Sequence, residues 1–330
     1  MKKILALGVI LFFVVMCIIP TTAQNIEKPS LLTSSGQWLY VGGSGPGNYT
    51  RIQDAIDNAS DGDTVFVYHG IYSDYFPEKF ACVNIEKTLT LMGEDKRTTI
   101  IDGTASQYHG IYVRADYISV TISGFTIQKA TASGIWIESL TGLGGLNVIV
   151  HDTIIKENGH GLTICDVNNG EFYNNIISYC SNGIEIYGLN NGIIHNNSIL
   201  NNNVAIFIYY SGQYIIEHNN IKNNGYGIRF YGRGVEIRYN NFLNNKIDAK
   251  GYGWYSLFTF LHNPLILFPR QTWEKNYWDK LIVSMPKPIF ATVTIYISIP
   301  RFFGFNIGVF RSIQCDWHPA KEPYDIPGIS

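Results

Sequence analysis

Short apolar segments recur through the middle of the chain at a constant spacing, separated by polar turns. Five positions 22 residues apart are aliphatic: Ile155, Ile177, Ile199, Ile221 and Leu243. A second series at the same step is asparagine: Asn175, Asn197, Asn219 and Asn241. A third series begins segments of the form small-apolar-x-apolar: Gly161, Gly183, Ala205 and Gly227. This repeat predicts a stacked parallel β-solenoid of about 22 residues per coil, whose coils bury their apolar faces against their neighbours.

The regular coils are predicted to run from Gly110 to about Gly253. The small-residue series extends back through Gly134 to Gly110, with gaps of 27 and 24 residues before it settles at 22. The gap of 27 contains a Gly-rich insertion at residues 139–147, SLTGLGGLN. Insertions in solenoids project from one side of the coil, so a loop is predicted here.

Both ends of the solenoid are predicted to be capped. Apolar residues at helical spacing in 49–59 predict a short helix over the first coil, before strands near 64–68, 82–85, 89–92 and 99–102. After about residue 253 the periodicity stops, and residues 254–330 hold four of the six tryptophans. The predicted fold class is all-β. The predicted organisation is a connecting segment at 24–48, a parallel β-helix domain with its N-terminal cap at 49–253, and an aromatic-rich C-terminal cap at 254–330.

The N-terminus has the pattern of a signal peptide at residues 1–23. Lys2 and Lys3 precede an apolar run at 4–19, and small residues follow, so cleavage near Gln24 and an exported location are predicted, extracellular or at the cell surface. An uncleaved anchor is the alternative, although this run is short for a membrane span. No other span is predicted, because charged and helix-breaking residues interrupt the apolar segment 289–310.

Composition changes the picture in two respects. Charged residues make up 15% of the chain, the net charge is −2, and no basic stripe is present, so nucleic acid is not a predicted partner. Four cysteines lie outside the leader without CxxC spacing and are predicted to be small buried residues, with their disulfide state left open: Cys82, Cys165, Cys180 and Cys315.

Alternation along the strands predicts two outward-facing columns of side chains, two and four residues after each small residue. The first column is Tyr112, Trp136, Thr163, Glu185, Phe207 and Arg229. The second is Arg114, Glu138, Cys165, Tyr187, Tyr209 and Tyr231. Exposed aromatic rings stack on sugar rings, and neighbouring Glu and Arg bind hydroxyls or uronate carboxylates. The predicted carbohydrate-binding residues are Tyr112, Trp136, Tyr187, Phe207, Tyr209 and Tyr231. The alternative is a cross-strand aromatic ladder that only stabilises the sheet.

Candidates for catalysis are weaker. Glu138 and Glu185 are two coils apart, and Arg229 is a candidate base for a lyase reaction. The asparagine series is predicted to be structural, with amides hydrogen-bonded along the solenoid.

No metal site or cofactor is predicted. One further column reads His151, Tyr173, His195, Glu217 and Tyr239. Its two histidines are about 9.6 Å apart along the stack, too far to bind one ion, so an aromatic and imidazole stack is predicted instead. Calcium binding is left open, but no residue pattern supports a site for it.

Several segments resemble a known family. The opening IQDAIDNASDGDTVFVYHGIYSD and VNIEKTLTLMGEDKRTTIIDG, with the later NGIEI, HNNSILNN and HNNIKNNGYGI, resemble NosD-like proteins of the pectin-lyase-like superfamily, including archaeal-type secreted members. The resemblance covers about residues 45–250, and the NYW and PY segments near the end are similar to the tails of such chains. It implies a right-handed parallel β-helix, export and a carbohydrate-related role. It supplies no catalytic residue, because the carboxylate and basic clusters of pectate lyases and polygalacturonases have no counterpart here.

The sequence therefore predicts an exported cell-surface β-helix protein that binds a polysaccharide on an aromatic face. A polysaccharide lyase or glycoside hydrolase acting on the same face is the first alternative. A non-enzymatic structural protein, or a NosD-like accessory protein, is the second.

Overall fold

The computed structural model describes residues 36–105, 108–142, 145–209, 212–231, 234–256, 271–279, 286–297 and 305–326. All of these belong to one compact unit, Thr33–Ser330. The predicted signal peptide at 1–23 and residues 24–35 of the predicted connecting segment lie outside the described residues. Parts of the predicted C-terminal cap also lie outside them.

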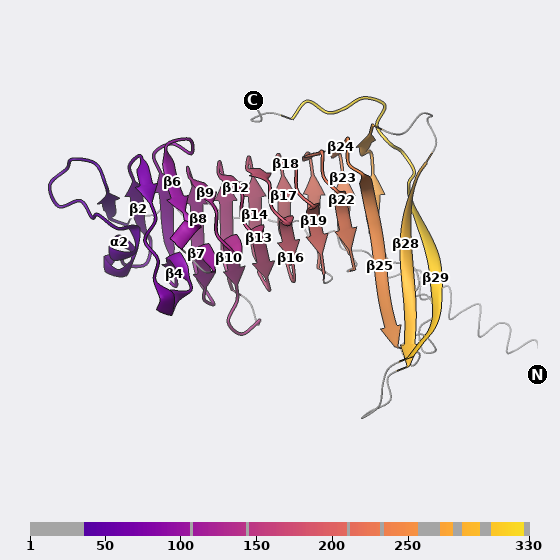
Figure 1. Ribbon diagram of the computed structural model, residues 1–330, viewed down its shortest axis with the longest axis horizontal. Coiled ribbons are helices and arrows are strands. Elements are labelled where there is room, and N and C mark those ends of the chain that lie inside the picture. The colour runs from indigo at the N-terminus through magenta and orange to yellow at the C-terminus, as the bar shows by residue number, and fades with distance from the viewer. Residues whose placement is uncertain are drawn as a thin grey trace, which may run out of the picture. The chain divides into compact units, whose positions relative to one another are not determined.

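Three parallel sheets run along this unit, and the chain visits them in the order A, B, C in every coil (Figure 1). The described strands form nine such coils, from β2–β3–β4 to β26–β27–β28. One extra strand, β1, precedes the first coil on sheet A, and β29 pairs antiparallel with β28 at the end of sheet C. The predicted parallel β-helix is confirmed.

Sheet A contains β1 Trp38–Val41, β2 Asp63–Val67, β5 Leu89–Gly93, β8 Ser119–Ser123, β11 Asn147–His151, β14 Asn169–Tyr173, β17 Gly192–His195, β20 Tyr214–Glu217, β23 Val235–Arg238 and β26 Thr272–Glu274. Sheet B contains β3 Gly70–Tyr72, β6 Thr99–Asp102, β9 Thr126–Gln128, β12 Ile154–Lys156, β15 Ile176–Ser178, β18 Ser198–Leu200, β21 Asn220–Lys222, β24 Asn241–Leu243 and β27 Tyr277–Trp278. Sheet C contains β4 Ala81–Ile85, β7 His109–Arg114, β10 Ser133–Glu138, β13 His160–Cys165, β16 Asn182–Ile186, β19 Val204–Ile208, β22 Tyr226–Phe230, β25 Ile247–Ser256, β28 Lys287–Ile297 and β29 Phe305–Asp316. The described helices are α2 Ile52–Asn58 and the short 3-10 turns Pro77–Lys79 and Gly103–Ala105.

The predicted N-terminal helix is confirmed as α2, which contacts β1, β2 and β4. Its apolar residues Ile52, Ala55 and Ile56 are buried against the first coil. The Gln53 side chain accepts a hydrogen bond from the Asn84 backbone N–H at 2.7 Å and donates to the Asn84 carbonyl at 3.2 Å. The Gln53 amide therefore takes the place of a neighbouring strand at this end of sheet C.

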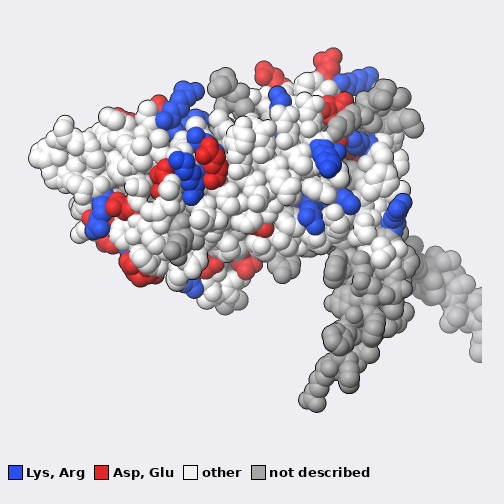
Figure 2. Space-filling view, viewed as in Figure 1, with Lys and Arg blue, Asp and Glu red and all other residues white. Residues whose placement is uncertain are grey.

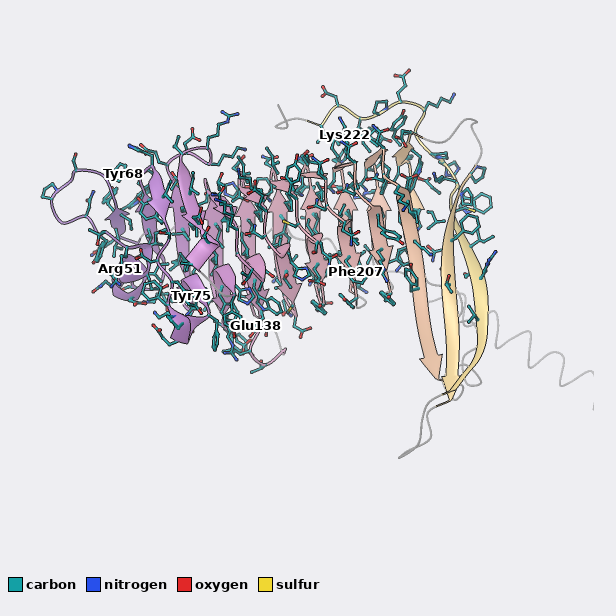
Figure 3. The ribbon with its side chains drawn as sticks, in the orientation of Figure 1. Arg51, Tyr68, Tyr75, Glu138, Phe207 and Lys222 are labelled. Atoms are coloured by element: carbon teal, nitrogen blue, oxygen red, sulfur yellow. The ribbon has the colours of Figure 1, made fainter. Side chains whose placement is uncertain are left out.

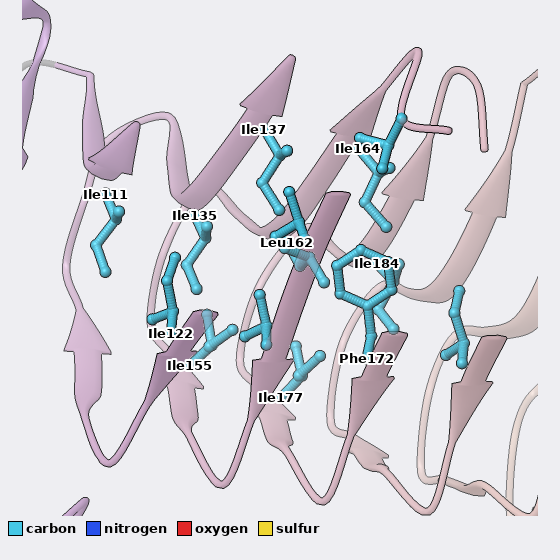
Figure 4. Close-up of a cluster of buried hydrophobic side chains, with 14 of the residues drawn as sticks. Ile111, Ile122, Ile135, Ile137, Ile155, Leu162, Ile164, Phe172, Ile177 and Ile184 are labelled. Atoms are coloured by element: carbon cyan, nitrogen blue, oxygen red, sulfur yellow. The ribbon is translucent and has the colours of Figure 1, made fainter. Parts of the chain in front are cut away.

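The core consists of aliphatic columns along the solenoid, one side chain per coil (Figure 4). Ile155, Ile177, Ile199 and Ile221 stack in register and are fully buried. The next member is Phe242, which pairs with Ile221, and not Leu243 as the constant spacing predicted. The segment 231–234 between β22 and β23 is one residue shorter than the segment 209–213 between β19 and β20, so every column shifts by one position after it.

The same shift corrects the asparagine series. Asn175, Asn197 and Asn219 are members of a buried ladder, but its next member is Asn240 and not Asn241. At each step the side-chain oxygen accepts from both the backbone N–H and the side-chain amide of the preceding asparagine, at 2.9–3.1 Å. The ladder satisfies buried backbone groups at one corner of the coil, which confirms its structural role.

A ninth coil lies beyond the predicted boundary at residue 253. Thr272–Glu274 and Tyr277–Trp278 extend sheets A and B in register, and Trp278 stacks on Phe242 with ring centroids 4.2 Å apart. Asn276 continues the asparagine ladder. The prediction that the periodicity stops near 253 is therefore wrong for the described residues 271–279. The sequence signal is hidden because 15 residues separate β25 from β26, whereas four separate β22 from β23.

Two further observations concern the chain as a whole. In the part that the structure describes, no helix has the length and apolar character needed to cross a membrane. Cys82 and Cys180 are buried, Cys165 and Cys315 are half-buried, and no disulfide joins any two of these four described residues.

Candidate functional site

The two predicted columns lie on the outer side of sheet C, as the register shows. Tyr112, Trp136, Thr163, Glu185, Phe207 and Arg229 pair in succession, and the column extends to Asn84 at one end and Lys250 at the other. Glu138 and Phe207 are labelled on this side in Figure 3, whereas Lys222 of sheet B lies on another. The sequence therefore identified the face correctly, although not the exposure of each residue on it.

A fixed carboxylate occupies one end of this face. Glu138 accepts hydrogen bonds from Tyr112 Oη at 2.7 Å and Trp136 Nε1 at 2.9 Å, and Arg114 Nε lies 3.0 Å from it. Burial and the hydrogen bond to Glu138 raise the pKa of Tyr112, so its hydroxyl stays protonated as a donor. Tyr112, Trp136 and Arg114 thus hold Glu138 in one orientation.

A neutral histidine packs behind this carboxylate. His109 packs against Trp136 and Tyr112 with tilted rings, whose centroids lie 5.0 and 5.3 Å away. Burial lowers the pKa of His109 to about 4, and Nδ1 accepts a hydrogen bond from the Ser133 backbone N–H at 3.3 Å. Because the imidazole is uncharged at neutral pH, it acts here as a packing group.

Glu185 is not the exposed carboxylate that strand alternation predicted, because only 3% of it is accessible. Asn182 Nδ2 and Tyr187 Oη donate to Glu185 Oε1 at 3.1 and 3.2 Å, and His160 Nδ1 lies 3.2 Å from Oε2. Burial and the charge of Glu185 raise the pKa of Tyr187. Glu185 is therefore a buried carboxylate whose hydrogen-bond partners come from its own coil, with His160 of the preceding coil beside it.

The structure does not bring Glu138 and Glu185 together. They lie on β10 and β16, two strands apart in sheet C, and each has its own set of partners. Cys165 lies between them, next to Glu138 in register. Burial and the neighbouring carboxylates raise the pKa of Cys165 to about 12, so its thiol is protonated and unreactive at neutral pH.

A row of stacked tyrosines forms the middle of the face. Tyr187 and Tyr209 have centroids 4.4 Å apart and planes 8° apart, and Tyr231 continues the row 6.0 Å beyond Tyr209. Tyr252 follows 5.2 Å beyond Tyr231. The rings therefore cover one another's faces in a cross-strand ladder, and ring edges and hydroxyls remain for contact with a ligand.

Phe207 is also not exposed as predicted. Only 6% of it is accessible, because Tyr209 packs on it at 4.2 Å and the Arg229 guanidinium lies 5.0 Å from its ring centroid. Thr163, in the same column, is fully buried. Long side chains of the same coil and of the next coil thus cover Phe207.

Two cationic residues, Arg229 and Lys250, lie at the end of the tyrosine row and have no acidic partner among the described residues. The Arg229 guanidinium lies 4.7 Å from the ring centroid of Tyr252, and Nη2 donates to Tyr231 Oη at 3.1 Å. Lys250 Nζ lies 5.2 Å from the centroid of Tyr252. Among the described residues neither cation forms an ion pair, unlike Arg114 with Glu138. Figure 2 shows Lys and Arg side chains on largely uncharged surface near β22 and β25.

The predicted histidine column is a stack on sheet A. Tyr173 lies between His151 and His195, with centroids 4.9 and 5.2 Å away. Glu217 follows His195, but the fifth member is Arg238 and not Tyr239, again because of the shortened turn. Within the described ranges, no three His, Cys, Asp or Glu residues are grouped as metal ligands.

Comparison with known families decides the classification. A family model described as a right handed beta helix region matches residues 95–263, just over half of the chain. The chain belongs to the right-handed β-helix family. The resemblance to pectin-lyase-like proteins is thereby confirmed at the level of the fold.

One solved structure has the same fold. Pectate lyase Pel9A is similar over 76% of this chain and 73% of its own, with 12% identity and a TM-score of 0.52. The A-module of mannuronan C-5 epimerase AlgE4 from Azotobacter vinelandii aligns over 62% of this chain and 76% of its own, with 16% identity and a TM-score of 0.36. A search among curated protein sequences finds no match.

Sequence reasoning missed several members of the site. His109, Asn182 and His160 begin their strands one residue before the small residue, a position that the two predicted binding columns do not include. Lys250 and Tyr252 follow in the next coil at a spacing of 21, where the signal was present in the sequence.

Proposed function

We propose that the outer face of sheet C binds an acidic polysaccharide at the cell surface after export. The observation behind the proposal is the pair Arg229 and Lys250, which have no ion-pair partner among the described residues and lie beside a row of tyrosines. Cations without acidic neighbours attract carboxylates, and an extended chain of uronate residues presents carboxylates at regular intervals.

The tyrosine row supports the proposal in a different way from the one first expected. Stacked rings do not offer their faces to sugars, but the row is rigid and presents phenol hydroxyls along the solenoid. Hydroxyls at fixed spacing donate and accept hydrogen bonds with sugar hydroxyls at small entropic cost. Tyr112 and Trp136 extend the face toward the N-terminal coils, and they also hold Glu138.

Binding without catalysis agrees best with the state of the candidate catalytic groups. Glu138 already has Tyr112, Trp136 and Arg114 as partners, and Glu185 is buried. Arg229 lies against aromatic rings and has no base to deprotonate it. Pectate lyase Pel9A shares the fold, which adds a polysaccharide-related precedent but no reaction.

Affinity electrophoresis tests the proposal. The chain beginning at Gln24 is run through gels containing polygalacturonate, alginate or a neutral glucan, with and without calcium. We expect retardation in the acidic gels that falls as salt is raised, because ionic contacts are screened. Equal mobility in all gels would contradict the proposal. Unsaturated products or new reducing ends in the same mixtures would instead establish the catalytic alternative.

A further inference from the structure

The two ends of sheet C differ in how their edges are protected. Sheets A and B end in strands of two to four residues: β1, β26, β3 and β27. Sheet C begins at β4, with five residues, and ends at β29, with twelve. Short strands offer few unpaired backbone groups, so β4 and β29 are the edges that need protection.

The β4 edge is closed by residues of this chain. Gln53 of α2 accepts from the Asn84 N–H and donates to the Asn84 carbonyl, as an adjacent strand would do. The turn before β4 adds an antiparallel bridge between Phe76 and Ala81. A second molecule therefore cannot add a strand at this end without displacing α2.

The β29 edge is open in the part of the chain that the structure describes, where β29 pairs only with β28. Two large apolar side chains are exposed among its described residues: Val309 and Ile313 are 64% and 56% accessible, with exposed Arg311 between them. Trp317, just after the strand, is 67% accessible. The strand contains no proline and no lysine, the residues with which proteins commonly protect an edge. A long edge with exposed apolar side chains, and with neither proline nor lysine, is a pairing surface.

We propose that β29 pairs antiparallel, edge to edge, with β29 of a second copy of this chain. The closed β4 edge excludes a head-to-tail array through sheet C, which leaves like-with-like pairing. Such pairing is isologous about a two-fold axis, and it closes at a dimer instead of growing into a fibre. It joins the sheet C faces of two molecules into one continuous sheet and does not depend on what that face binds.

Sedimentation velocity of the purified chain tests the proposal over a series from about 1 to 100 μM, the range in which small interfaces associate. We expect a reversible monomer–dimer equilibrium. The double substitution Val309→Lys with Ile313→Lys places like charges on the edge and should weaken the dimer at least tenfold. Phe290→Lys is the matched control, because Phe290 is 53% accessible and pairs with Ile313, but lies on the inner strand β28.

Three results would overturn the proposal: a monomer throughout the concentration series, a dimer whose affinity the double substitution does not change, or a loss of dimer affinity with Phe290→Lys equal to that with the double substitution. The last would place the contact on the face of the hairpin and not on its edge. Hydrogen exchange of the unsubstituted chain gives a second measurement that needs no variant. Amides in 305–316 should exchange more slowly as concentration rises, and exchange independent of concentration would contradict edge pairing.

Discussion

The carboxylate of Asp316 accepts hydrogen bonds from both the backbone N–H and the side-chain amide of Asn276, at 2.9 and 3.2 Å. Asn276 is the last asparagine of the ladder, so Asp316 takes the place of the next one. Asp316 is fully buried, and its carboxylate also accepts hydrogen bonds from Trp278 Nε1 and the backbone N–H groups of Lys275 and His318. Since every ladder amide donates toward the C-terminal end, an acceptor without donors of its own is the suitable last member.

We expect Asp316→Asn to destabilise the protein by about 2–4 kcal/mol, because the new amide would direct its own N–H groups at buried donors. Urea unfolding monitored by circular dichroism measures the change. Asp325→Asn is the matched control, since Asp325 is an exposed residue near the same end of the chain. An unchanged midpoint for Asp316→Asn would show that the ladder does not need an anionic end.

Asn219, in the middle of the ladder, should be equally sensitive. Its amide donates to the carbonyls of Ile194 and Glu217 and to Asn240 Oδ1, and its own oxygen accepts from Asn197. Asn219→Ala would leave several buried groups unpaired, so a loss of at least about 3 kcal/mol is expected. Asn203→Ala, at an exposed position, should change the unfolding midpoint little. Equal effects of the two substitutions would contradict a special role for the ladder.

His109 makes stability depend on pH. Its pKa is about 4 in the folded protein, because of burial, and about 6.5 in the unfolded chain. Between these two pH values the unfolded chain binds a proton at His109 that the folded protein does not bind. The contribution of His109 to the free energy of unfolding is therefore fully present above about pH 6.5, and about 3 kcal/mol of it is lost as the pH drops toward 4. His109→Gln should flatten that dependence in thermal melts at a series of pH values.

The matched control is His69→Gln, because His69 is exposed, with a side chain 73% accessible. This substitution should leave the pH profile nearly parallel to that of the unsubstituted chain. If the stability of His109→Gln still fell steeply with decreasing pH, groups other than His109 would be responsible for the pH dependence.

The sequence predicted the coil and its faces well, because burial imposes a strict period on apolar residues. Ile155 and Asn197 lie where a step of 22 places them. Leu243, Asn241 and Tyr239 do not, because the turn at 231–234 is one residue short. The alternation of apolar residues within strands does not report the length of the segment between two strands. A single deletion in such a segment therefore shifts the assignment of every later residue to its column.

The candidate site was predictable in position but not in detail. Alternation showed that Glu185 and Phe207 point outward, but not that neighbouring side chains cover them. The partners of Glu138 come from its own strand and the preceding one, at a gap of 24 residues where the repeat is irregular. Asp316, which ends the ladder, lies 40 residues beyond Asn276, and no local pattern connects the two residues.

The central claim, that cations and tyrosines on sheet C bind an acidic polysaccharide, is tested most directly by titrating polygalacturonate into Arg229→Gln, Lys250→Gln and the unsubstituted chain. Each substitution should weaken binding about three- to tenfold, the effect of losing one ionic contact, and the two effects should diminish in high salt. Lys222→Gln, an exposed lysine on sheet B, is the control and should bind as the unsubstituted chain does. Equal affinity of all four proteins, or no binding by any, would contradict the account.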